Sequence, residues 1–128
     1  MISISRAGST RSPVIVLGPL AFKFARNEKG RASNLYEAKL YRTVNETRRA
    51  LLCPPLWVSP SGALLVMRAA KPFTEMMSEQ EYWEVINAWE YGPGEDSCPF
   101  EPKASDWGWF NGRKVALDYS TPAWENME

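Results

Sequence analysis

Two aspartates near the ends of a predicted hairpin are the residues whose types and spacing best suggest chemistry. The stretch Asp106–Ser120 contains Asn111-Gly112, a pair that suits the two positive-φ positions of a type I′ turn, and short strand-like runs flank it. Such a hairpin brings Asp106 and Asp118 to the same end. Two carboxylates at one point could share a divalent cation. The alternative is that each is an exposed aspartate at the end of a strand.

The elements before this hairpin begin with a predicted antiparallel meander. Its strands are expected at Ile2–Ser5, Pro13–Leu17 and Leu20–Arg26, with a polar loop at 6–12 and a turn at Gly18-Pro19. Residues 27–31 are expected to break the pattern.

Helical periodicity follows the meander. Apolar residues at Tyr36, Leu40, Val44 and Leu51 predict one amphipathic helix over residues 32–52, which Pro54-Pro55 would end. Two further strands are expected at 56–58 and 63–68. A capping box at Ser78–Glu81 predicts a second helix up to residue 92, and the Pro- and Gly-rich stretch 92–105 predicts irregular structure. The fold class is therefore α+β, with a small antiparallel sheet, one long helix, a second helix and a final hairpin.

Composition is typical of one soluble globular domain over residues 1–128. The chain is 45% hydrophobic, and none of its apolar runs approaches the ~20 residues that span a bilayer, so we expect a cytoplasmic protein. It contains no histidine, which excludes Ser-His-Asp and Cys-His catalysis. Cys53 and Cys98 lack a CxxC partner and are expected to be reduced, with packing roles.

The zero net charge hides a strong asymmetry. Residues 1–70 hold eleven Lys/Arg and three Asp/Glu, a net of +8, and residues 71–128 hold four and twelve, a net of −8. Either the halves face each other, or each half meets a partner of opposite sign. The basic half would suit phosphates, and nucleic acid binding is possible through its cations: Arg6, Arg11, Lys23, Arg26, Lys29 and Arg31. The acidic half would suit a basic protein surface.

The order of these elements resembles the protein-kinase-like fold. Leu20-Ala-Phe-Lys23 is similar to the Val-Ala-x-Lys strand, and Asn34-Leu-Tyr-Glu37 lies where a helix carries the glutamate that pairs with that lysine. Residues 54–67 are similar to the fourth and fifth strands, and 68–72 to the hinge. Residues 100–106 are similar to the catalytic loop, and 115–120 to the strand that leads into Asp-Phe-Gly.

The resemblance implies roles for particular residues. Lys23, Glu37 and Glu101 would be catalytic, with Glu101 in the position of the general base. Asp106 and Asp118 would hold Mg²⁺, while ATP would meet the cofactor-binding residues Ala21, Lys23, Arg6 and Arg11. Two simpler interpretations stand beside these roles: Asn34-x-x-Glu37 as a capping box, and Lys23 as a solvent-facing strand lysine.

Several residues depart from the kinase pattern. The first loop has one glycine, Glu101 replaces the usual aspartate, and Tyr119-Ser120 replaces Phe-Gly. The ten residues that follow Asp118 would not hold an activation segment or most of a helical C-lobe. The resemblance therefore implies a reduced, pseudokinase-like member.

Two functions of different class follow from these observations. The first is a regulator or inhibitor that binds a partner protein, with Glu79, Glu81 and Glu84 as contacts and tryptophans 83, 89, 107 and 109 as anchors or, alternatively, as core. By analogy, such a small protein is similar to phage-borne inhibitors, of which anti-CRISPR proteins are one class. The alternative is a minimal ATP- and Mg-dependent phosphotransferase or nucleotide-binding enzyme.

Overall fold

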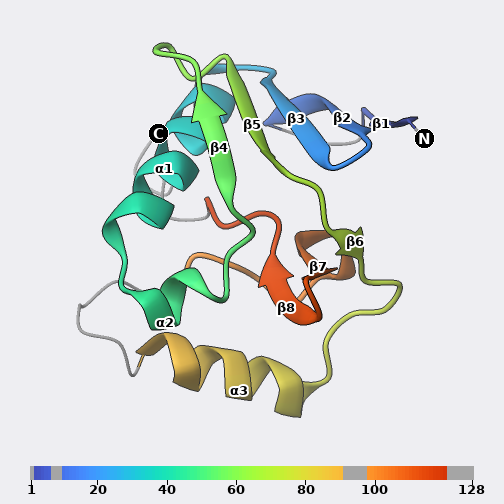
Figure 1. The fold of residues 1–128 in the computed structure, drawn as a ribbon, viewed down its shortest axis with the longest axis vertical. Helices are drawn as coiled ribbons and strands as arrows, with labels where there is room; N and C mark the ends of the chain where they lie inside the picture. The colour runs from blue at the N-terminus through green and yellow to red at the C-terminus, as the bar shows by residue number, and fades with distance from the viewer. Residues whose placement is uncertain (1, 7–9, 91–97, 121–128) are drawn as a thin grey trace.

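Two antiparallel sheets and three helices form the part of the chain that the computed structural model describes, residues 2–6, 10–90 and 98–120 (Figure 1). The larger sheet has the strand order β1-β2-β3-β5-β4. Its strands are β1 (Ile2–Ser5), β2 (Arg11–Leu17), β3 (Leu20–Ala25), β4 (Pro55–Val58) and β5 (Leu64–Arg68). The smaller sheet contains β6 (Lys71–Pro72), β7 (Trp107–Phe110) and β8 (Arg113–Ala116).

The predicted meander is confirmed as β1-β2-β3, but the loop after β1 is shorter than expected. Strand β2 begins at Arg11, where the backbone is paired with Ala25 of β3. The polar character of Arg11-Ser12 suggested a loop, yet Arg11 is buried and ion-paired. Residues 7–9 of the predicted loop lie outside the described residues.

The strand alternation ends before residues 27–31, as predicted, but α1 (Glu28–Thr43) begins there, four residues before the expected helix start at residue 32. The side chain of Asn27 accepts a hydrogen bond from the Gly30 backbone N–H at 2.9 Å, which caps the helix. Gly30 is needed for packing, since a Cβ at this position would lie 2.0 Å from the Thr10 carbonyl oxygen. The chain thus turns from the sheet into the helix without a separate loop.

The single helix predicted over residues 32–52 is in fact divided. α1 ends at Thr43, and Asn45 caps α2 (Glu46–Arg49) by accepting a hydrogen bond from the Arg48 N–H at 2.9 Å. Arg48 is buried, donates from Nε to the Trp89 carbonyl at 2.8 Å and stacks on that indole at 4.7 Å. Two contacts explain the break: the Asn45 cap, which starts a new helix, and the buried contact of Arg48 with Trp89. The periodicity of apolar residues indicates neither of them.

The predicted capping box is confirmed at the start of α3 (Glu79–Glu90). The Glu81 N–H donates to Ser78 Oγ at 3.1 Å, and the Ser78 N–H donates to Glu81 Oε1 at 3.3 Å. At the other end of α3, the Trp89 ring packs edge-on against Phe100 with centroids 5.5 Å apart. This contact attaches the helix to the core. Residues 91–97, which include the end of the predicted helix and the first part of the predicted irregular stretch 92–105, lie outside the described residues.

The predicted hairpin is also confirmed. Asn111 and Gly112 have φ values of 51° and 78°, as a type I′ turn requires. A short 3₁₀ helix, η1 (Ala104–Asp106), leads into β7, and the Leu117 N–H donates to the Asp106 carbonyl at 2.7 Å. Asp106 and Asp118 therefore lie at the same end of the hairpin.

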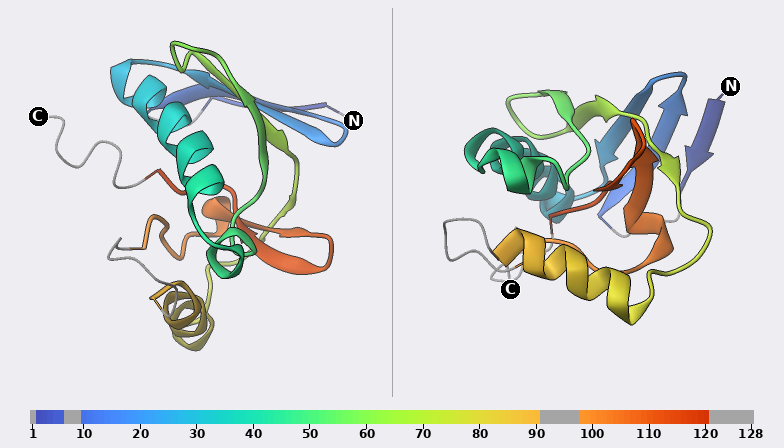
Figure 2. Two further views of the ribbon diagram at one scale, coloured as in Figure 1. Left: turned by 60° about the vertical axis from the view of Figure 1, so that its left-hand side comes forward. Right: turned by 60° about the horizontal axis from the view of Figure 1, so that its bottom comes forward.

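The elements are arranged around one buried interior. α1 packs against β3, β4 and β5 on one face of the large sheet. The small sheet lies beyond the lower end of the large sheet, and α3 lies below the small sheet (Figures 1 and 2). Core side chains come from both sheets and from the long helices: Leu40, Leu52, Leu65, Met67, Val85, Trp89, Phe100, Trp107, Val115 and Tyr119 are among them. No described helix is long and apolar enough to cross a bilayer.

Candidate functional site

A buried lysine-glutamate pair joins the large sheet to α1. Lys23 lies on the inner face of β3, and its Nζ is 3.1 Å from Glu37 Oε1 and also donates to the Leu117 carbonyl. Glu37 is completely buried. The interpretation of Lys23 as a solvent-facing lysine is therefore wrong, and the pairing that the resemblance implied is present.

Asn34 holds α1 against the sheet instead of capping a helix. It lies inside α1, and its Nδ2 donates to the Lys23 carbonyl at 3.1 Å and to the Gly62 carbonyl at 2.9 Å. These two bonds fix the position of the helix turn that carries Glu37. The capping-box interpretation of Asn34-x-x-Glu37 is wrong because Asn27 caps this helix.

Arg11 completes the cluster from the start of β2. Its guanidinium forms a forked ion pair with Glu37, with Nη1 on Oε1 and Nη2 3.1 Å from Oε2. The same Nη2 is 2.7 Å from Asp118 Oδ1. The resemblance implied that Arg11 would meet a ligand's anion, and in this structure it binds the chain's own two carboxylates.

The segment after β8 is fastened to the same glutamate. The Tyr119 N–H donates to Glu37 Oε2 at 2.7 Å, and the Tyr119 hydroxyl donates to the Cys53 carbonyl at 2.8 Å. Asp118 Oδ1 also accepts from Ser120 Oγ at 3.1 Å. The Asp118 side chain is 45% exposed, so this carboxylate forms the solvent-facing side of the cluster.

The charges of the cluster stabilise one another. Burial alone would lower the pKa of Arg11, but Glu37 and Asp118 hold it above its usual value. Burial and the neighbouring Arg11 lower the pKa of Lys23, against the opposing effect of Glu37. Burial alone would raise the pKa of Asp118, but Arg11 and Lys23 hold it well below its ordinary value. Two cations thus face two carboxylates, and the cluster is neutral as a whole.

Asp106 lies near this cluster, and its pKa is shifted in the opposite direction from that of Asp118. Burial, and then the charge of Asp118, raise its pKa to about 7, while Lys103 opposes the shift. Glu101 lies nearer the surface, where its carboxylate is 3.5 Å from Lys103 Nζ and 45% exposed. The candidate for the general base, Glu101, therefore pairs with a lysine near the surface.

These residues fit a divalent cation poorly. Magnesium sites in proteins supply excess negative charge through one or two carboxylates, together with substrate phosphates. Here Asp118 is already paired with Arg11, and burial raises the pKa of Asp106 to about 7, so this carboxyl is only partly ionised at neutral pH. Within the described ranges, no three carboxylate or thiol groups come together in a way that could hold a metal ion.

One solved structure shares this arrangement of elements. The choline/ethanolamine kinase family protein from Mesorhizobium loti superposes with a TM-score of 0.58 at 13% identity. The fold is kinase-like. The match covers 93% of this chain and 58% of the other, so the chain spans little more than half the length of that neighbour. No protein-family model and no curated protein sequence matches the chain.

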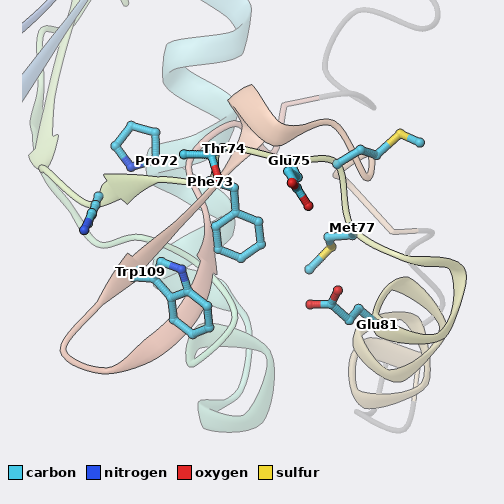
Figure 3. Close-up of a pocket in the computed structure, with 9 residues that line it drawn as sticks. Pro72, Phe73, Thr74, Glu75, Met77, Glu81 and Trp109 are labelled. Carbon is cyan, nitrogen blue, oxygen red and sulfur yellow. The ribbon is translucent and has the colours of Figure 1, made fainter.

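A pocket that sequence reasoning missed lies away from the charged cluster of the kinase-like fold. It has a volume of about 340 Å³ and is lined by residues 71–77, Glu81 and Trp109. Figure 3 shows Phe73 between Trp109 and Met77, and the Phe73 and Trp109 ring centroids are 5.2 Å apart. The pairing of β6 with β7 places Trp109 beside residues 71–73, and the Lys114–Glu81 ion pair links the hairpin to α3, so no local pattern predicts the pocket.

The predicted partner-binding residues lie on or near this region. Glu79 and Glu84 of α3 are exposed, whereas Glu81 is bound to Lys114 at 3.0 Å, a contact that lowers its pKa. Of the four tryptophans proposed as anchors, two are core and two are exposed: Trp89 and Trp107 are fully buried, and Trp83 and Trp109 are 59% and 45% exposed.

The predicted basic face for nucleic acid is smaller than expected. Arg11 and Lys23 are buried in the ion cluster and are turned away from any surface partner. Arg6, Arg26 and Lys29 remain exposed. Because burial removes two of the six predicted cations, the phosphate-binding interpretation of the basic half loses much of its support.

Proposed function

We propose that this kinase-like protein is non-catalytic and acts by binding a partner protein, as an inhibitor or regulator. The observation that supports this proposal is the pairing of Arg11 with both Glu37 and Asp118. A side chain of the protein supplies the positive charge that a catalytic site of this fold would take from a bound metal ion. The cluster therefore holds the fold together without a ligand.

Phosphoryl transfer makes demands that the cluster does not meet. It requires metal ions to neutralise the charge that develops on the phosphates, and a base to orient the attacking hydroxyl. An added divalent cation would meet a cluster that already contains equal numbers of cations and carboxylates. Glu101, in the place of the base, is directed at Lys103 instead of a substrate site.

The acidic half supplies a surface for such a partner. Trp83, Trp109 and Met76 are exposed by 59%, 45% and 67%, and exposed glutamates of α3 accompany them. Aromatic residues and methionine are enriched in protein interfaces, and carboxylates around them favour a basic partner. A phage origin, and an anti-CRISPR role in particular, stay predictions from the sequence. The contacts within the fold do not test them.

The second candidate is the minimal phosphotransferase or nucleotide-binding enzyme. The observation in its favour is the Lys23–Glu37 pair at 3.1 Å, which is a working part of active kinases. The half-exposed Asp118 carboxylate would be its metal ligand, with Asp106 as the second. This candidate requires Arg11 to move away from Asp118 when nucleotide binds.

Calorimetry with ATP and Mg²⁺ separates the two candidates. For the non-catalytic protein we expect no saturable heat up to millimolar nucleotide, because Arg11 and Lys23 are already paired with carboxylates. Asp118→Asn should then give the same flat titration. Saturable, Mg-dependent binding that Asp118→Asn weakens would contradict the proposal and support the phosphotransferase.

Charge reversal on α3 tests the partner surface. We expect Glu79→Lys combined with Glu84→Lys to reduce recovery of a bound protein roughly 10-fold or more, since two like charges would face a basic partner. Glu81 is left unchanged because it caps α3 and binds Lys114. The matched control is Glu46→Lys on α2, whose side chain is 97% exposed. Equal recovery with both variants, measured by affinity capture and quantitative mass spectrometry, would remove α3 from the interface.

A further inference from the structure

The strand register separates two very different faces of the large sheet. Residues that are directly paired across antiparallel strands point to the same side. One row crosses all five strands as Ile4, Ile15, Phe22, Val66 and Trp57. The adjacent row is Ser3, Val16, Ala21, Met67 and Pro55, and its members point to the opposite side.

The second of these rows faces the interior, and the first faces outward. Ala21 and Met67 are buried beneath α1, as is Lys23 two residues along. On the outer side, Ile4 and Trp57 at the two ends of the row are 50% and 54% exposed. The outer row is therefore as apolar as the inner one, although its two ends are exposed to water and its middle residues, Ile15, Phe22 and Val66, are only partly buried.

Further side chains extend this outer face. Leu17 pairs with Leu20, and Ile2 pairs with Leu17, so a second row lies beside the first; it is apolar on β1, β2 and β3 and ends on β5 at Arg68, the partner of Leu20. Ile2 and Leu17 are 63% and 48% exposed. Phe24 pairs with Leu64, and these two side chains form a third apolar row on the same face. We call the side chains of these rows the outer apolar face: Ile2, Ile4, Ile15, Leu17, Leu20, Phe22, Phe24, Trp57, Leu64 and Val66.

In the described part of the chain, no helix or strand packs on the outer apolar face. Both views in Figure 2 show α1 on the other side of the sheet and the small sheet beyond its end. The five strands contain no Asp or Glu, and their one exposed charge is Arg68 at the margin. Monomeric proteins rarely leave an apolar surface of this kind open, and an open one usually marks an interface.

We propose that the outer apolar face binds the same face of a second copy of this chain, forming a symmetric dimer. A two-fold axis would place apolar rows on apolar rows, and such contacts are self-complementary because they need no opposite charge. The dimer leaves the ion cluster and α3 free, so it goes beyond the proposed function and does not depend on it.

The width of the face favours a sheet as its cover. At about 4.8 Å between strands, five strands span about 24 Å. A helix with its side chains is about 10 Å wide, so one helix would leave Ile4 or Trp57 exposed at the edges. A second sheet of equal width, stacked about 10 Å away, covers both ends of the row.

The area of the face sets the expected strength of the dimer. Five strands of about five residues give a flat area of roughly 400 Å². This area does not include the extra surface of the side chains that project from the sheet. Stable interfaces bury about 800 Å² per partner. The flat area is about half of that value, so we expect a weak dimer of the transient class, which forms only at high protein concentration.

Sedimentation equilibrium of the full chain tests this proposal. As the concentration rises from about 1 to about 300 µM, the average mass should rise from 14.5 kDa toward twice that value. Ile4→Glu and Trp57→Glu should each weaken the dimer by about 100-fold, because the axis would place an unpaired carboxylate from each chain in the contact. Ser3→Glu is the matched control, because it adds the same charge to β1 on the opposite face.

Three results would overturn the dimer. One is a wild-type chain that stays monomeric over the whole range. Another is equal weakening by Ser3→Glu and Ile4→Glu, which would point to pairing along the β1 edge. The third is a monomer that binds vesicles of phosphatidylcholine with phosphatidylserine and loses that binding with Ile4→Glu, which would assign the face to a lipid surface. Circular dichroism confirms that each variant is folded, since both substituted side chains are half-exposed.

Discussion

Arg11→Met is expected to lower the free energy of unfolding by about 3–5 kcal/mol at pH 7, the usual cost of removing one partner from a buried ion pair. The guanidinium is buried and contacts both Glu37 and Asp118, so its loss leaves two carboxylates without their main counter-charge. Lys23 still pairs with Glu37 but does not replace the fork. Urea denaturation followed by tryptophan fluorescence measures the change.

The pH dependence and a matched control make this result specific. Asp118 has a depressed pKa in the folded chain, so its stabilising contribution is present above the unfolded value near 4 and is lost as the pH falls below it. The penalty of Arg11→Met should therefore shrink at pH 4, where Asp118 without its arginine partner takes up a proton more readily than in the wild type. Arg6→Met removes an exposed arginine and should change stability by no more than about 0.5 kcal/mol. If the two variants lost equal stability, the cluster would not be the source of the effect.

Asp106→Asn is expected to stabilise the protein above pH 7, by an amount that depends on pH. Its carboxyl has a pKa of about 7 when folded, against 3.8 as the ordinary value. Between about pH 4 and 7 the folded chain holds a proton that the unfolded chain has released, so this residue makes stability fall as the pH rises. At about 1.4 kcal/mol per pKa unit the full shift has an upper limit of about 4 kcal/mol, and partial exposure to solvent reduces the expected gain to about 1–2 kcal/mol.

The difference between variant and wild type is the quantity to measure. Thermal unfolding at pH 5 and pH 8 should show a gain for Asp106→Asn that grows with pH, while Glu46→Gln, 97% exposed, should be neutral at both. A variant that is less stable than the wild type at pH 8 would contradict the assignment. Stabilisation of the wild type by Mg²⁺ that Asp106→Asn abolishes would instead favour the phosphotransferase.

A neutral cluster at the centre of a kinase-like fold gives these predictions a common basis. In an active site of this fold, a metal ion and phosphates complete the balance of charge. Here Arg11 pairs with two carboxylates from within the chain, and under the proposed function the contacts that stabilise the fold also remove the demand for a ligand. Under the proposed function, stability and loss of catalysis are two consequences of one side chain.

Local patterns in the sequence were sufficient to predict the main order of strands and helices, and also some turns and helix caps. The type I′ turn at Asn111-Gly112, the capping box at Ser78–Glu81 and the meander of β1, β2 and β3 were all predicted and are present. Each depends on residues that are close in sequence or on alternation along one strand. The resemblance of Lys23 and Glu37 to kinase motifs also predicted their contact.

Other features depend on contacts between distant segments. Asn27 caps a helix that begins four residues before its expected start at residue 32, because Gly30 allows the helix to pack directly on Thr10. Asn45 ends the long helical period, and burial of Arg48 against Trp89 holds the new direction. Periodicity did not predict these changes because it reports which residues are apolar along an element and does not report which capping or packing contact ends that element.

The sequence by itself therefore determined the kinase-like order of elements, the hairpin with its two aspartates and the division of charge between the halves. Only the tertiary structure decided what those charges do. Arg11 is 26 residues from Glu37 and 107 from Asp118, and the folded sheet brings its guanidinium between them. Register likewise decided that one apolar row is core and its neighbour is surface, because alternation specifies two faces without specifying which of them is covered.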